Sequence, residues 1–157
     1  MVKIKQILLT FDIEEFDMPI ELGKEIGKDE QFKISEDGTK NVLDLLNKNN
    51  IRGTFFISAV FAEKYPELIK KISEKHEVGL HCYEHGDNYS KMDSKIAFEK
   101  LQSGKEILEE ITNKKIKSFR APRFQPPDYD VLNKLELKYD SSYHPTWIPG
   151  RYNNFFK

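Results

Sequence analysis

Residues 77–85 read Glu-Val-Gly-Leu-His-Cys-Tyr-Glu-His and place His81 and His85 where a short apolar run ends. Neutral imidazole is the commonest metal ligand in proteins, and a catalytic metal site takes three protein ligands and leaves one position open. Because Gly79 precedes the pair and Gly86 follows it, a strand running into a loop is favoured over a continuous helix. This disfavours a helical His-x-x-Glu-His zinc motif. Two solvated loop histidines are the alternative interpretation.

The composition is that of one globular domain. The chain has 157 residues, which is enough for a single buried core. Its 25 basic and 26 acidic side chains give a formal net charge of -1, so charge gives no reason to expect nucleic acid or a membrane as partner. The apolar run at residues 7–9 is too short for a signal peptide or a membrane span. Together with the single cysteine, Cys82, these features favour a cytoplasmic protein without disulfides.

Carboxylates follow the first predicted strand, at residues 4–11. Because side chains alternate along an extended chain, Asp12 and Glu14 are predicted to point to the same side. Two carboxylates in one small space suit divided roles, with one on a metal ion and one as a base. The alternative is a group of N-capping acids for a following helix, which Pro19 and Gly23 disfavour.

Helices and strands alternate along the rest of the chain. Residues 16–38 show no sustained period and are predicted to form a long surface loop, and His76 is predicted to be solvated. The alternation predicts an α/β fold with a parallel sheet and right-handed crossovers, either open or closed as a barrel. The predicted elements are helices from Thr39 to about Asn50, from Pro66, from Asp93 and around Val131, and strands at 52–57, 78–81, 116–119 and 138–142.

Chemically useful side chains lie at or just beyond the carboxyl ends of these strands. Such ends share one edge of a parallel sheet, where α/β proteins build their active sites. One carboxylate and two imidazoles complete an open metal site at that edge. The residues concerned are Asp12, Glu14, His81, Arg120 and His144.

Three motifs resemble those of the polysaccharide deacetylase (NodB-homology, carbohydrate esterase type) family. They are Leu-Thr-Phe-Asp at residues 9–12, the histidine stretch at 77–85, and Arg-Ala-Pro-Arg-Phe at 120–124, in that order. Residues 139–151 resemble a stretch found in one branch of the family. The resemblance implies a deformed (β/α) barrel and metal-dependent removal of N-acetyl groups from sugars.

The resemblance also implies roles for individual residues. Asp12 matches the catalytic base, Arg120 the arginine that orients the base, and His81 and His85 the metal ligands.

Two adjacent aspartates are usual in the family's first motif, whereas Ile13 here separates Asp12 from the next acid. The carboxylate ligand is therefore Glu14 or Glu15, and strand alternation favours Glu14.

The resemblance further implies a cofactor and a substrate. The cofactor is a divalent metal ion, with zinc first and cobalt, manganese, nickel or iron as alternatives. The expected partner is an N-acetylated carbohydrate, which Arg123 and His144 are predicted to bind. Hydrolysis of another linear amide is the alternative reaction, and a catalytically impaired sugar-binding module is the alternative without chemistry. A non-haem iron oxygenase is disfavoured because that chemistry typically uses another fold.

The family's later motifs, including a histidine that acts as general acid, are expected beyond residue 157. The chain is therefore predicted to form a partial barrel, truncated after about five strands. Because unpaired sheet edges invite association between chains, a homo-oligomer is also expected.

Overall fold

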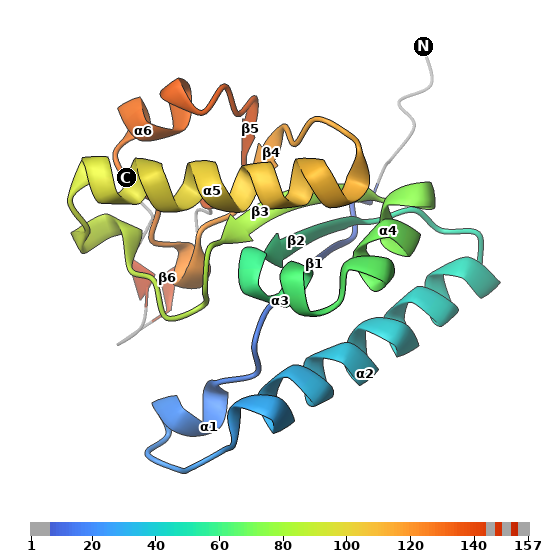
Figure 1. The fold of residues 1–157 in the computed structure, drawn as a ribbon. Helices are drawn as coiled ribbons and strands as arrows, with labels where there is room; N and C mark the ends of the chain where they lie inside the picture. Colours follow the sequence, from blue (N-terminus) through green and yellow to red (C-terminus); the bar gives the residue numbers. More distant parts are fainter. Residues whose placement is uncertain (1–6, 144–146, 149–151, 154–157) are drawn as a thin grey trace.

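The computed structural model describes residues 7–143, 147–148 and 152–153. Its centre is a five-stranded sheet in the order β1-β2-β3-β4-β5, in which neighbouring strands are parallel (Figure 1). A separate antiparallel pair of strands follows. The strands are β1 (Thr10–Ile13), β2 (Thr54–Ser58), β3 (Glu77–Cys82), β4 (Ser118–Phe119) and β5 (Tyr139–Asp140), and the pair is β6 (Trp147–Ile148) and β7 (Tyr152–Asn153).

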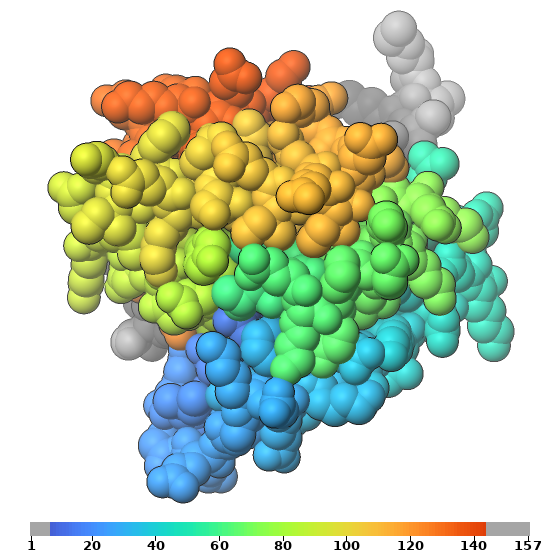
Figure 2. Space-filling view, in the orientation of Figure 1, coloured from blue at the N-terminus to red at the C-terminus, as the bar shows by residue number. Residues whose placement is uncertain are grey.

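Helices connect successive strands of the sheet. They are α1 (Met18–Glu21), α2 (Lys28–Lys48), α3 (Ala59–Lys64), α4 (Pro66–Lys75), α5 (Ser94–Thr112) and α6 (Tyr129–Lys134), with 3-10 turns η1 (Tyr89–Lys91) and η2 (Pro122–Phe124). Figure 2 shows α1 and the start of α2, in blue, projecting at the lower end of the molecule. The parallel order of the strands confirms the predicted α/β fold class, and the sheet is open.

Strands β2 and β3 form the buried centre of the sheet. Phe55 and Ile57 in β2 and Leu80 in β3 are fully buried, as expected for parallel strands covered on both faces. Gly79 lies opposite Phe56 in the strand register, and a Cβ atom at Gly79 would come within 2.7 Å of the Phe56 ring. Glycine at this position therefore allows the two strands to pack closely.

Helices α3, α4 and α5 pack against one another and against the central strands. Helix α5 begins at Ser94, directly after the N-cap Asp93, whose carboxylate accepts hydrogen bonds from the backbone N–H groups of Lys95 (2.9 Å) and Ile96 (3.3 Å). Several of its apolar side chains, among them Ala97 and Leu101, are buried. Helix α4 begins at Pro66, as predicted.

The prediction of a loop over residues 16–38 is wrong. Helix α2 begins at Lys28, eleven positions before the predicted start, and is preceded by the short helix α1. Tertiary packing explains the difference, because Phe32 in the first half of α2 is buried and its ring stacks on Phe61 at 6.3 Å. Gly38 lies in the middle of α2 with open space around it. A solvated glycine there weakens the helical pattern in the sequence, although the helix continues through it.

The prediction that His76 is solvated is also wrong. Its exposed fraction is 7%, and the Gly53 N–H donates a hydrogen bond to His76 Nδ1 at 3.2 Å. The imidazole also makes an edge contact with the Phe55 ring, at 5.1 Å between ring centroids. Burial, with the nearby Lys75 and Arg52 charges as smaller causes, lowers the pKa of His76. His76 is therefore a neutral core residue between α4 and β3.

The ends of the chain differ from expectation in their boundaries. Strand β1 runs from Thr10 to Ile13 rather than over residues 4–11, of which 4–6 lie outside the described residues. Strand β5 covers two residues instead of 138–142. His144, predicted to bind substrate, also lies outside the described residues.

Among the residues that the structure describes, no helix combines the length and the apolar character that a membrane span requires.

Candidate metal centre

The carboxyl edge of the sheet brings together residues from three strands. Glu14 follows the last residue of β1, His81 is the fifth residue of β3, and His85 lies three positions beyond that strand. Arg120 directly follows β4, and its backbone N–H donates to the Leu80 carbonyl at 3.0 Å. All strands of a parallel sheet end at the same edge, so the residues that follow these strands lie close together.

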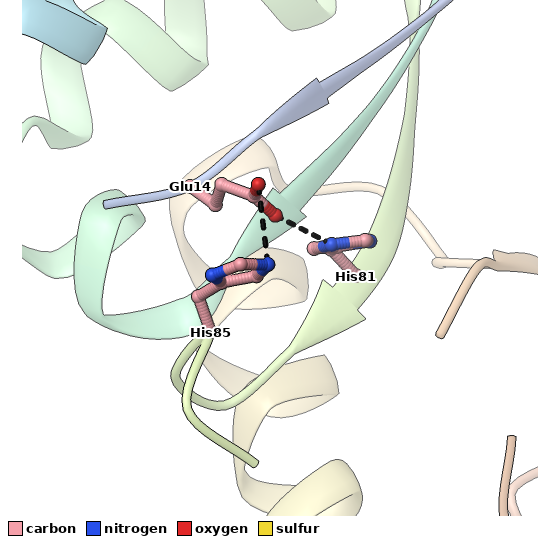
Figure 3. A group of neighbouring side chains, drawn as sticks. All are labelled: Glu14, His81 and His85. Carbon is pink, nitrogen blue, oxygen red and sulfur yellow. Dashed lines mark ion pairs between the residues drawn. The ribbon is translucent and has the colours of Figure 1, made fainter. Parts of the chain in front are cut away.

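Glu14, His81 and His85 form a compact cluster (Figure 3). Glu14 Oε2 lies 2.7 Å from His81 Nε2, and Glu14 Oε1 lies 3.3 Å from His85 Nε2. The two imidazole rings are nearly parallel, with an interplanar angle of 13° and 6.1 Å between centroids. Both histidines are buried, with exposed fractions of 2% and 8%.

The donor atoms of this cluster fit one metal ion. Each side chain offers a ligand atom, and the three atoms lie within 4.8 Å of one another. Glu14 Oε2 is buried and has no hydrogen-bond partner among the described residues, although it lies so close to His81 Nε2. A buried carboxylate oxygen without a hydrogen bond is costly unless a cation satisfies it. Two imidazoles with one carboxylate are a known ligand set of catalytic zinc, with a position left open.

Glu15 is the other carboxylate that the sequence offers as a ligand, and the structure places it outside the cluster. Its exposed fraction is 7%. Ser58 Oγ donates to Glu15 Oε2 at 2.7 Å, and the His85 backbone N–H donates to Glu15 Oε1 at 3.4 Å. Glu15 therefore links the end of β1 to the start of α3 and to the loop that carries His85, residues 83–88, called the histidine loop below. Strand alternation accounts for the opposite directions of Glu14 and Glu15.

Asp12 and Arg120 form an ion pair beside this cluster. Arg120 Nη1 donates to Asp12 Oδ1 at 2.8 Å, while Nη2 donates to Thr10 Oγ1 at 3.0 Å and to Ser141 Oγ at 2.8 Å. The guanidinium lies over the Phe56 ring, 4.5 Å from its centroid. Arg120 is thus held on several sides, and it fixes the orientation of the Asp12 carboxylate.

Arg123, predicted to bind substrate, contacts other parts of the chain. Its Nη1 donates to the His85 carbonyl at 3.0 Å, and its Nε donates to Glu21 Oε1 at 2.8 Å. Arg123 and Phe124 both have positive φ angles, of 51° and 55°. Such conformations cost about 1–3 kcal/mol each for residues other than glycine and occur often at functional sites. Arg123 therefore links α1 to the histidine loop, and its contact with substrate stays a prediction.

A second hydrogen-bond network stabilises the loop that carries His85. Tyr89 Oη donates to Asp87 Oδ2 at 2.9 Å and accepts from the Tyr83 N–H at 2.8 Å. Lys100 in α5 pairs with Asp87 and, at 3.0 Å, with Glu84. The sequence predicts only a loop here, because Lys100 lies on the following helix, 13 positions after Asp87.

The sequence also gives no indication that Asp17 contacts His85. Its Oδ1 lies 2.8 Å from His85 Nδ1, on the side of the ring opposite Glu14. Asp17 lies within the stretch predicted to be a loop, and the two residues are 68 positions apart. No local signal in the sequence connects them.

Cys82 follows the first histidine of the cluster and is fully buried. Burial, together with the nearby carboxylates of Glu15 and Glu14, raises the pKa of the thiol well above its usual range. The thiol is therefore protonated at neutral pH, and thiolate is the form that binds metals. Cys82 packs in the core.

A cavity of about 550 Å³ opens beside the cluster. Both acidic and apolar side chains line it, so it joins the reactive groups to an apolar wall on α1 and α2. The lining includes Asp12, Glu14, His85, Met18, Ile34 and Val42.

The parallel sheet with a Glu–His–His cluster at its carboxyl edge defines an α/β protein with a candidate metal centre. The model of the polysaccharide deacetylase family matches residues 2–139, and the chain belongs to that family.

Curated relatives agree with this assignment. A peptidoglycan-N-acetylmuramic acid deacetylase of Bacillus subtilis is 34% identical over 105 residues, which are 66% of this chain and 40% of the relative. A peptidoglycan-N-acetylglucosamine deacetylase of Bacillus cereus is 31% identical over 102 residues, which are 64% of this chain and 34% of the relative. The chain therefore matches less than half of the length of each.

Solved structures share the fold. A putative polysaccharide deacetylase from Mycobacterium smegmatis superimposes with a TM-score of 0.72 at 24% identity, over 88% of this chain and 51% of that one. A CE4-family pseudoenzyme from Bacillus anthracis superimposes with a TM-score of 0.65 at 20% identity, over 85% of this chain and 41% of that one. The five-stranded sheet thus corresponds to part of a larger (β/α) barrel.

Proposed function

We propose that this chain carries the metal-binding half of an active site that removes N-acetyl groups from amino sugars. The observation that carries the proposal is the convergence of the Glu14–His81–His85 cluster and the Asp12–Arg120 pair on one edge of the sheet. Membership of the polysaccharide deacetylase family supports the reaction type. Because related folds host different chemistries, the proposal rests on the site rather than on the fold.

Glu14, His81 and His85 would hold the divalent ion, with zinc as the expected metal. A metal ion in such a site polarises a carbonyl oxygen and lowers the pKa of a bound water to about 7. The buried Glu14 Oε2 without a hydrogen bond is the feature that favours a cation at this point.

Asp12 acts as the general base. It takes a proton from the attacking water while the water oxygen bonds to the acetamide carbon. Arg120 holds the carboxylate in place through its 2.8 Å contact. The amide C–N bond then breaks as a general acid protonates the sugar nitrogen, and this acid regains its proton from Asp12 through the solvent. Acetic acid leaves and ionises to acetate. His144, predicted from the sequence to lie at this edge, is a candidate for that general acid, and it lies outside the described residues.

The proposed substrate class is an oligomer of N-acetylated hexosamine. The net charge of -1 gives no general attraction for a polyanion. The names of the curated relatives, which specify N-acetylglucosamine and N-acetylmuramic acid in peptidoglycan, support the acetamido group as the part that reacts. The cavity beside the cluster offers room for one sugar ring against an apolar wall.

Acetate release from acetylated chito-oligosaccharide tests the proposal. The chain should release acetate with added zinc or cobalt and not after treatment with a chelator. Release of acetate that is unaffected by chelation would overturn the metal role. Binding of the sugar without any release would favour a sugar-binding module, and release only from a linear amide that lacks a sugar would favour the alternative hydrolase.

A further inference from the structure

We infer that Asp17 is a positioning residue for the metal centre, because its carboxylate fixes the ring of His85 so that Nε2 faces Glu14. The inference rests on the proposed function, since it concerns the same metal site. It adds a residue that neither the motifs nor the family resemblance indicates.

The geometry around the His85 ring carries the inference. Asp17 Oδ1 lies 2.8 Å from His85 Nδ1, and Glu14 Oε1 lies 3.3 Å from His85 Nε2. A carboxylate oxygen accepts hydrogen bonds, so this contact selects the His85 tautomer in which Nδ1 carries the hydrogen. In that tautomer the lone pair is on Nε2, which faces the cluster.

His85 has more need of such support than His81 has. His81 lies within β3, where the strand hydrogen bonds and burial fix its position. His85 lies in the loop after β3, so its ring depends on contacts from other segments. Its backbone N–H donates to Glu15, and its carbonyl accepts from Arg123. Asp17 adds the contact that sets the rotation of the ring.

The contacts of Asp17 itself favour this role over a purely structural one. It occupies the N-cap position of α1 but makes no side-chain capping hydrogen bond, and α1 has no buried residues. Its second oxygen, Oδ2, lies 3.8 Å from Arg123 Nη2. One oxygen therefore contacts His85 and the other lies near Arg123, whereas neither caps the helix. In known sites, loss of a carboxylate that orients a metal-binding histidine costs about 10- to 100-fold in metal affinity.

The test measures zinc affinity by competition with a chelating dye, and the melting temperature of the metal-free chain, for Asp17→Ala, Asp17→Asn and Asp37→Ala. Asp37 is an exposed carboxylate on α2 that pairs with Lys33, so its removal matches the charge change away from the site. Asp17→Ala should weaken zinc binding about 10- to 100-fold. Asp17→Asn should recover part of this loss, because its amide oxygen still accepts from Nδ1. The three metal-free variants should melt at similar temperatures.

A spectrum with cobalt separates positioning from ligation. At saturating cobalt, Asp17→Ala should keep the visible absorption spectrum of the unsubstituted chain, because the three ligands are unchanged. A changed spectrum would make Asp17 a ligand and overturn the inference, as would unchanged zinc affinity in Asp17→Ala. Equal destabilisation of both metal-free Asp17 variants, with affinity lost in proportion, would show a structural role and also overturn it. If the unsubstituted chain binds no zinc, the proposed metal site fails and this role fails with it.

Discussion

Asp12 and Arg120 lie 108 positions apart in the sequence, yet Arg120 Nη1 donates a 2.8 Å hydrogen bond to Asp12 Oδ1. The contact joins the first strand of the sheet to the fourth, across the ends of β2 and β3. It places an oriented carboxylate beside a separate cluster of metal-ligand type. The division between a base and a ligand set can therefore be tested one residue at a time.

Asp12→Asn should remove the base and leave the ligands intact. Hydrolysis should fall by about 100- to 10,000-fold, because general acid–base groups contribute rate factors of that size. Zinc content, measured by mass spectrometry of the metal, should stay that of the unsubstituted chain. Loss of zinc in this variant would instead make Asp12 a ligand.

Arg120→Lys should keep the positive charge. It should lose the planar guanidinium group that donates hydrogen bonds to Thr10 and Ser141 as well as to Asp12. A misplaced catalytic group can cost about 100-fold, so kcat for acetate release should fall to that extent. Zinc affinity should not change, because Arg120 does not contact the cluster side chains. Full activity in Arg120→Lys would contradict its role in orienting the base.

Two glycines should respond in opposite directions to alanine. At Gly79 a Cβ would come within 2.5 Å of Ser118 Oγ and 2.7 Å of the Phe56 ring, so Gly79→Ala should lower the free energy of unfolding by about 1–3 kcal/mol. At Gly38, in the middle of α2, a Cβ meets nothing within 4 Å. Gly38→Ala should raise that free energy by about 0.5–1 kcal/mol. Denaturant titration of both variants measures the two changes, and a stabilising Gly79→Ala would refute the close packing of β2 and β3.

His76 should make stability depend on pH. Its pKa is lowered in the folded chain, chiefly by burial, so the unfolded chain binds more protons than the folded chain between the two pKa values. Stability from this group is full above the unfolded pKa of about 6.5 and is lost as pH falls through the lower folded pKa. His76→Gln stays neutral, so its melting temperature should fall less between pH 7 and pH 5 than that of the unsubstituted chain. Parallel curves for the two proteins would rule out this role.

The sequence predicts which residues gather at the carboxyl edge of the sheet better than it predicts the first connection of the fold. Short apolar strands followed at once by Asp12, His81 and Arg120 are local patterns, and a parallel sheet collects their ends without further information. The sequence does not predict the first half of α2, because the buried ring that stabilises it, Phe32, packs on a residue of α3 that is distant in the sequence. The role of Asp17 is not predicted for the same reason, since its partner, His85, lies 68 positions away.

Zinc titration by calorimetry tests the central claim, that Glu14, His81 and His85 bind one divalent ion. The unsubstituted chain should bind one zinc ion per chain, and His81→Ala and His85→Ala should each abolish binding. Glu14→Gln should weaken it strongly, whereas Glu15→Gln and His76→Gln should bind as the unsubstituted chain does. Equal loss of zinc in all five variants, or undiminished binding in His81→Ala and His85→Ala, would contradict the account.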